Sequence, residues 1–213
     1  MFSKKLMRQI EQQRIIAVLV VDRAEDGVPL ARALLDGGVD IMELTLRTDD
    51  ALEALRQIVQ EVPEMTVGAG TVLRPEQVRQ VQDAGAAFAV APGMNPRILK
   101  AAQDAGMSFA PGIVTPSDIE QALEFGCRLL KFFPCAPSGG LPYLKSIAAP
   151  FAHLGVRFIP LGGLTVSNMA EYLTDPLIAA IGGSWLAPRD LIRAGDWTQI
   201  TELAREARKK TKS

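Results

Sequence analysis

A lysine and a glutamate stand in unusually apolar surroundings in this chain. Lys131 lies within the segment RLLKFFP, and Glu43 lies within IMELTL. Lysine is almost never fully buried without a partner, and a carboxylate in an apolar strand is costly unless it is paired or protonated. Burial disfavours the ammonium form and leaves a free amine, which is what Schiff-base formation with a ketone requires. The two residues therefore predict a lysine nucleophile and a carboxylate that transfers protons.

Each residue also has a purely structural explanation. Lys131 at a strand end can keep its ammonium group in water while its methylenes pack on apolar neighbours. Glu43 can form an internal ion pair with a lysine or with Arg47, because alternate residues of a strand point to the same face. The catalytic interpretation is favoured because both groups are expected on one face of the same sheet.

Glycine pairs follow the last two predicted strands. Gly162 and Gly163 follow one strand, and Gly182 and Gly183, with Ser184 next, follow the other. Paired glycines let backbone N–H groups approach an anion, and the start of a following helix adds a favourable dipole. In (β/α)8 barrels these two loops commonly bind phosphate, so we expect a phosphate site there. Thr71, in the loop after the third predicted strand, offers a further anion site through its hydroxyl and backbone.

Short apolar segments that alternate with amphipathic helical segments must position these groups. Strands are expected to begin near residues 15, 39, 66, 87, 108, 128, 157 and 178, at spacings of 20 to 29 residues. A helix is expected over residues 51–61, where apolar residues recur on one face. Pro75, Pro96 and Pro116 each mark a helix start.

This regular alternation predicts an α/β protein with parallel strands. Eight strand–helix units in 213 residues indicate a (β/α)8 TIM barrel, with an extra N-terminal helix before Ile15. We expect residues 1–213 to form one domain. An open doubly wound sheet is the alternative, and it is disfavoured because no G-x-G-x-x-G motif follows the first strand.

Composition argues against several classes of protein. Apolar residues make up 48% and charged residues 22%, as in ordinary globular proteins. A net charge of −1 gives no basic excess for nucleic acid or a membrane surface, and no apolar run is long enough to span a membrane. One histidine and two cysteines are too few for most zinc sites or a disulfide framework. We therefore expect a cytoplasmic protein without metal or cofactor.

Several segments together are similar to one enzyme family. They are ELTLRT from residue 43, VGAGTV from 67, APG from 91, KFFP from 131, IGGSWL from 181 and LAREA from 203. In this combination and order the chain resembles the aldolases of 2-keto-3-deoxy-6-phosphogluconate (KDPG) and 4-hydroxy-2-oxoglutarate (KHG).

The resemblance implies a homotrimeric class I aldolase, without metal, that cleaves KDPG to pyruvate and glyceraldehyde 3-phosphate. It implies that Lys131 forms the Schiff base and that Glu43 moves protons. It also implies a carboxylate site at Arg47 and Thr71, pocket walls at Pro92 and Phe133, and a phosphate site at Gly162, Gly163, Gly183 and Ser184.

Two positions depart from the family pattern. Leu161 stands where a threonine usually precedes the glycine pair, and Val20 stands where some members carry an arginine. The first departure bears on recognition of the distal hydroxyl groups. The nearest alternative function is KHG cleavage to pyruvate and glyoxylate. A non-covalent phosphate-binding barrel, such as a sugar-phosphate isomerase, is disfavoured because it has no evident need for a buried amine.

Overall fold

Short strands alternate with helices along the described chain. The computed structural model describes residues 2–211. The strands are β1 (Ile15–Leu19), β2 (Ile41–Thr45), β3 (Thr66–Gly70), β4 (Phe88–Val90), β5 (Phe109–Ala110), β6 (Gly112–Ile113), β7 (Leu129–Phe132), β8 (Arg157–Pro160) and β9 (Ile181–Gly183). The helices are α1 (Lys4–Gln13), α2 (Gly27–Asp36), α3 (Ala51–Glu61), α4 (Pro75–Asp83), α5 (Pro96–Asp104), α6 (Pro116–Glu124), α7 (Gly140–Ala148), α8 (Met169–Leu173), α9 (Arg189–Ala194) and α10 (Trp197–Lys210). Three short 3₁₀ helices are η1 (Ala24–Asp26), η2 (Ala136–Ser138) and η3 (Ala149–Leu154).

Local sequence signals explain where several helices begin. Proline is the first residue of α4, α5 and α6, where its missing N–H group costs no helical hydrogen bond. The side chains of Asn95 and Thr115 cap α5 and α6 by accepting hydrogen bonds from the first turn. These caps fix the turns that lead out of the strands toward the outer helices.

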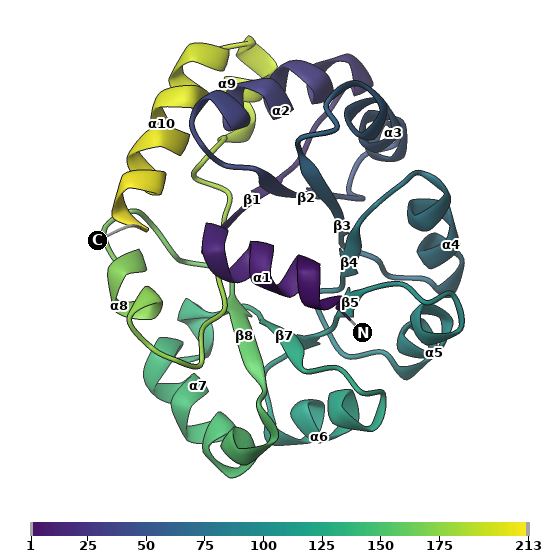
Figure 1. Ribbon diagram of the computed structural model, residues 1–213, viewed down its shortest axis with the longest axis vertical. Helices are drawn as coiled ribbons and strands as arrows, with labels where there is room; N and C mark the ends of the chain where they lie inside the picture. Colours follow the sequence, from purple (N-terminus) through teal and green to yellow (C-terminus); the bar gives the residue numbers. More distant parts are fainter. Residues whose placement is uncertain (1, 212–213) are drawn as a thin grey trace.

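The predicted closed eight-stranded barrel is wrong. All strand pairs named here are parallel, but they form two sheets rather than one closed sheet. Six strands follow the order β5-β4-β3-β2-β1-β9, and three follow the order β6-β7-β8. The six-stranded sheet curls as a half-barrel, and the smaller sheet faces it within the ring of helices (Figure 1).

Breaks in the hydrogen-bonded ladders account for the division into two sheets. Pro111 lies between β5 and β6 and has no N–H group to continue a ladder. Residues on either side of it therefore pair with different neighbours, β4 for β5 and β7 for β6. On the opposite side, β8 meets the segment before β9 through one isolated bridge, between Phe158 and Ile178.

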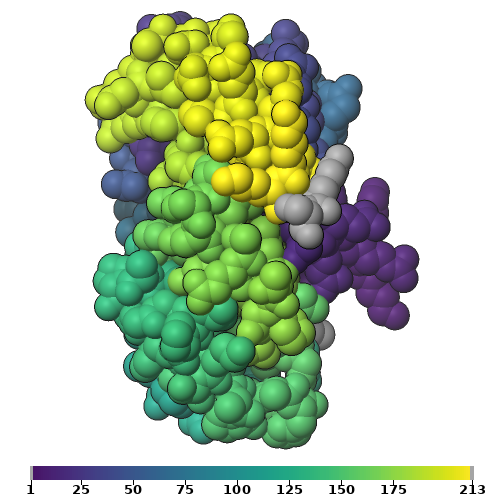
Figure 2. Space-filling view, turned by 90° about the vertical axis from the view of Figure 1, so that its left-hand side faces the viewer, coloured from purple at the N-terminus to yellow at the C-terminus, as the bar shows by residue number. Residues whose placement is uncertain are grey.

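Helix α1 lies across the ring at the ends where the strands begin (Figure 1). Gln9 donates a hydrogen bond of 2.8 Å to the Thr66 hydroxyl at the start of β3. Glu11 forms an ion pair with Arg157 at the start of β8. The purple N-terminal segment projects from one face of the molecule (Figure 2). The opposite ends of the strands are therefore the ends that are open to form a site.

Two hydrophobic clusters form the core. The larger cluster includes the buried residues of the outer helices, such as Leu34 and Leu55, and the strand residues that pack against them. The smaller cluster lies inside the ring and includes Ile16, Phe88 and Ile159. Within residues 2–211, no helix is long and apolar enough to cross a membrane.

Candidate active site

Lys131 and Glu43 meet inside the ring. Lys131 comes from β7 and Glu43 from β2, so the pair joins the two sheets. The Lys131 Nζ donates a hydrogen bond of 3.0 Å to the Glu43 Oε1. Only 6% of Lys131 and 3% of Glu43 is exposed, and the Nζ lies 5.5 Å from the centroid of the Phe133 ring. Removing one partner of such a buried pair typically costs about 3–5 kcal/mol, because the other charge is left without a partner.

Glycines on β3 make room for the Glu43 carboxylate. A Cβ atom at Gly70 would overlap Glu43, lying 2.7 Å from its Cγ and 2.8 Å from its Cδ. A Cβ atom at Gly68, two residues earlier on the same face, would overlap the ring of Phe88. The absence of side chains at these two positions therefore leaves space for both a carboxylate and an aromatic ring between the two sheets.

A cavity of about 210 Å³ opens beside the pair, at the ends where the strands finish. Eight of the ten residues predicted for the site line it: Glu43, Arg47, Thr71, Pro92, Lys131, Phe133, Gly162 and Ser184. The other two, Gly163 and Gly183, do not line the cavity. Gly183 has a structural role, because a Cβ atom there would overlap the ring of Trp185.

Thr71 has a backbone conformation that its side chain disfavours. Its φ angle of 59° lies in the left-handed region, which is unusual for a β-branched residue. Such a conformation costs about 1–3 kcal/mol and persists where the surroundings enforce it. The residue lies between β3 and the start of α4 and lines the cavity, so the backbone turn brings Thr71 to the site.

One wall of the cavity is apolar, and the sequence analysis singled out two of its residues, Val20 and Leu161, but not Val18. Val18, Val20 and Leu161 line this wall, and Leu161 is 5% exposed. A Cβ atom at Gly182 would overlap the Leu161 side chain, so this glycine makes room for the leucine. The alternation of β1, which places Val18 on the same face as Ile16, was the signal that could have identified Val18.

The outer mouth of the site carries guanidinium groups. A neighbouring hollow of about 350 Å³ shares Arg47 and Ser184 with the cavity and is also lined by Arg189 of α9. Arg189 and Arg193 donate hydrogen bonds to Asp22 and hold the pKa of that carboxyl well below its usual range. Asp22 therefore stays ionised, and of these two arginines Arg189 lines the hollow beside Ser184.

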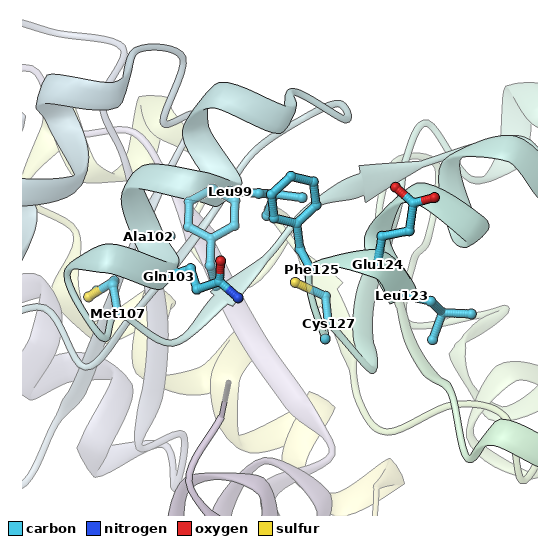
Figure 3. A pocket seen from close by; sticks show the side chains of 10 residues that line it. Leu99, Ala102, Gln103, Met107, Leu123, Glu124, Phe125 and Cys127 are labelled. Atoms are coloured by element: carbon cyan, nitrogen blue, oxygen red, sulfur yellow. The ribbon is translucent and has the colours of Figure 1, made fainter.

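Another hollow, of about 340 Å³, lies away from Lys131 at the C-terminal ends of α5 and α6 (Figure 3). Its lining is mostly apolar and includes Leu99 and Phe125, with Gln103 and Glu124 exposed. Burial raises the pKa of the Cys127 thiol in this lining to about 11, so the thiol stays protonated at neutral pH. This hollow offers no activated nucleophile. Among residues 2–211, no group of His, Cys, Asp and Glu side chains is arranged to hold a metal ion.

Comparison with known proteins identifies the family. The model of the KDPG and KHG aldolase family matches residues 6–203. The KHG/KDPG aldolase of Escherichia coli K12 is 47% identical over 193 residues, which cover 91% of this chain and 90% of that protein. The 2-dehydro-3-deoxy-phosphogluconate aldolase of Treponema pallidum is 45% identical over 94% of this chain and 95% of that protein.

A solved structure is similar in fold as well as in sequence. The KDPG aldolase of Legionella pneumophila, with pyruvate captured as a covalent carbinolamine intermediate, superposes with a TM-score of 0.89 at 39% identity. The match covers 93% of this chain and 96% of that chain. The chain therefore belongs to the KDPG and KHG aldolase family and is an aldolase, a carbon–carbon lyase.

Proposed function

We propose that this protein is a class I aldolase that cleaves KDPG to pyruvate and glyceraldehyde 3-phosphate. The observation that carries the proposal is the buried Lys131–Glu43 pair, with its Nζ–Oε1 distance of 3.0 Å, at the wall of a cavity. The relatives named above as KDPG aldolases support the same activity.

The proposed reaction begins when the neutral Lys131 amine attacks the C2 carbonyl carbon and forms a carbinolamine. Loss of water gives an iminium, and Glu43, directly or through one water, takes the proton of the C4 hydroxyl. The C3–C4 bond then breaks, the aldehyde leaves, and the electron pair moves toward the iminium nitrogen to give an enamine. Protonation at C3 and addition of water release pyruvate and restore the amine.

We assign the remaining polar residues to the two ends of the substrate. Arg47 and Thr71 bind the pyruvate carboxylate, and Pro92 and Phe133 position the reacting carbons. The phosphate binds at the loops after β8 and β9, through Ser184 and the backbone of Gly162, Gly163 and Gly183. Arg189, which lines the hollow beside Ser184 and pairs with Asp22, adds a guanidinium group near these loops.

KHG is a second candidate substrate. The Escherichia coli relative carries both substrates in its name, and the family description names both aldolases. KHG ends in a C5 carboxylate where KDPG continues to a C6 phosphate, so its C1 carboxylate would use the same site as KDPG and its shorter distal end would make fewer contacts with the loops after β8 and β9.

We also propose the setting in which the enzyme works. It is a homotrimer in which residues 1–213 of each subunit form one domain, and it acts in the cytoplasm in the Entner–Doudoroff route. The two cysteines, both buried without a disulfide among residues 2–211, accord with a reducing compartment. Light scattering should give three times the 23.0 kDa mass of one chain.

A coupled assay tests the proposed activity. Purified enzyme is mixed with KDPG, and pyruvate release is followed through NADH consumption by lactate dehydrogenase. Wild-type enzyme should release one pyruvate per KDPG, and a folded Lys131→Met variant should release none above background. Conversion of a sugar phosphate without pyruvate release would instead support an isomerase.

A further inference from the structure

Phe2 lies between the catalytic pair and the surface of the molecule at the ends where the strands begin. A small inner hollow is lined by Phe2, Glu43 and Lys131, together with Phe88 and Leu161. A separate groove of about 200 Å³ on the side of α1 is lined by Phe2 and Met7 but by neither catalytic candidate. Among the described residues of α1 and of the segment before it, Phe2 is the one that lines both the inner hollow and the groove.

The start of α1 holds this ring in place. Ser3 caps the helix, and its hydroxyl accepts a hydrogen bond of 3.2 Å from the Leu6 N–H group. Phe2 before the cap and Met7 in the first turn then occupy the two positions of a hydrophobic staple. The Phe2 ring packs against Phe88, with ring centroids 6.0 Å apart. The ring is thus fixed by its own helix and by β4.

The inner hollow is too small for more than about one water molecule. Its volume is about 10 Å³, at the lower limit for a single water molecule. Its lining is apolar except for Glu43 and Lys131 and includes Ile16, Val90 and Ile159. Without the Phe2 ring, the inner hollow and the groove beside α1 would join. Water could then reach the catalytic pair from the ends where the strands begin.

We infer that Phe2 is a positioning residue: it closes the inner end of the catalytic cavity and keeps water away from Lys131 and Glu43. The inference rests on the proposed function. Water at the pair would compete for the hydrogen bond that Lys131 Nζ donates to Glu43 Oε1 and weaken the electrostatic interaction between the two side chains. Lys131 and Glu43 would then be held less firmly in the geometry that attack on the ketone and proton transfer require.

Replacing the aromatic ring tests the inference. Phe2→Ala should lower kcat on KDPG by about tenfold, the effect of about 1.4 kcal/mol on the barrier. KM should change less than about threefold, because Phe2 does not line the cavity in which the substrate binds. The rate of borohydride-trapped pyruvate adduct formation at Lys131 should fall in parallel. Phe2→Leu, which keeps an apolar side chain, should recover most of the loss.

Ile10→Val is the matched control. Ile10 is a buried residue of α1 that lines neither the groove nor the inner hollow, so the loss of a methyl group there weakens helix packing and leaves the Phe2 ring in place. Its kcat should stay within about twofold of wild type. If Phe2→Ala does not fold, Phe2→Gln, which retains much of the volume but carries a polar amide, should show the same loss of kcat.

Two outcomes overturn the inference. A folded Phe2→Ala variant with wild-type kcat would show that the ring does not protect the pair, and an equal loss in Ile10→Val would reduce its role to helix packing. Failure of the wild-type enzyme itself to form a pyruvate adduct at Lys131 would contradict the proposed function, which separates the two claims.

Discussion

Gly70→Ala should misplace the Glu43 carboxylate while leaving the backbone of β3 intact. The added Cβ atom would lie 2.7 Å from Glu43 Cγ and 2.8 Å from Cδ, whereas carbon atoms in contact are about 3.5–4.0 Å apart. The glutamate side chain must therefore move by about 1 Å. Its Oε1 is the atom that accepts the 3.0 Å hydrogen bond from Lys131, so the same shift disturbs the catalytic pair.

A displacement of 1 Å in a catalytic group can cost about 10²-fold in rate. Overpacking of a filled interior typically lowers the free energy of unfolding by about 1–3 kcal/mol. We therefore expect kcat for pyruvate release from KDPG to fall by about 10²-fold in a protein that still folds. Coupled kinetics with lactate dehydrogenase, together with a thermal melt, measure both effects.

Gly93→Ala is the control for an added methyl group near the site. No heavy atom of the described residues lies within 4 Å of a Cβ atom built at Gly93, apart from its chain neighbours, and its φ lies outside the left-handed region. This variant should keep both its stability and its kcat. If Gly70→Ala retains more than about a third of wild-type kcat, the position of the Glu43 carboxylate does not limit the reaction.

Three further substitutions test other parts of the site. Glu43→Gln should keep the fold and the pyruvate adduct but lower turnover by about 10²–10⁴-fold, and retention of more than about a third of turnover would assign proton transfer to another group. Ser184→Ala should raise KM for KDPG more than for KHG, because only KDPG carries the phosphate that Ser184 is proposed to bind. A hydrogen bond to a charged group contributes about 1.5–3 kcal/mol, and equal changes in KM would place the phosphate elsewhere. Leu161→Thr should raise kcat/KM on KDPG by up to about tenfold by restoring one hydrogen bond to a distal hydroxyl, and a lower value would show that leucine suits the preferred substrate.

The regular elements could be predicted because their signals are local. Each predicted strand start lies within three residues of an observed strand, and α3 has the predicted bounds of residues 51–61. Pro75, Pro96 and Pro116 each begin a helix, as expected from the fixed φ of proline. These features depend on a few neighbouring residues and little on the rest of the fold.

Closure of the sheet could not be predicted from alternation alone. It depends on whether hydrogen bonding continues from each strand to its neighbour, and two interruptions prevent this. Pro111, inside the fifth predicted strand, was the visible signal for one of them. The isolated bridge between Phe158 and Ile178 has no comparable signal, because it depends on how residues far apart in the chain pack.

In the candidate site, too, features with a local signal could be predicted and features that depend on long-range packing could not. Lys131 and Glu43 stood out because charged residues in apolar segments need a partner, and the structure pairs them. The left-handed backbone of Thr71 and the contact between Leu161 and Gly182 had no such signal. Both depend on long-range packing, which places Leu161 on an apolar wall shared with β1.

The most direct test of the account is to trap the covalent intermediate on its lysine. Enzyme is incubated with pyruvate and borohydride, and the adduct is located by intact mass and peptide mapping. The account predicts one reduced pyruvate adduct per chain, on Lys131, the lysine buried beside Glu43. An adduct on the exposed Lys100 or Lys145, or on no lysine, would contradict it.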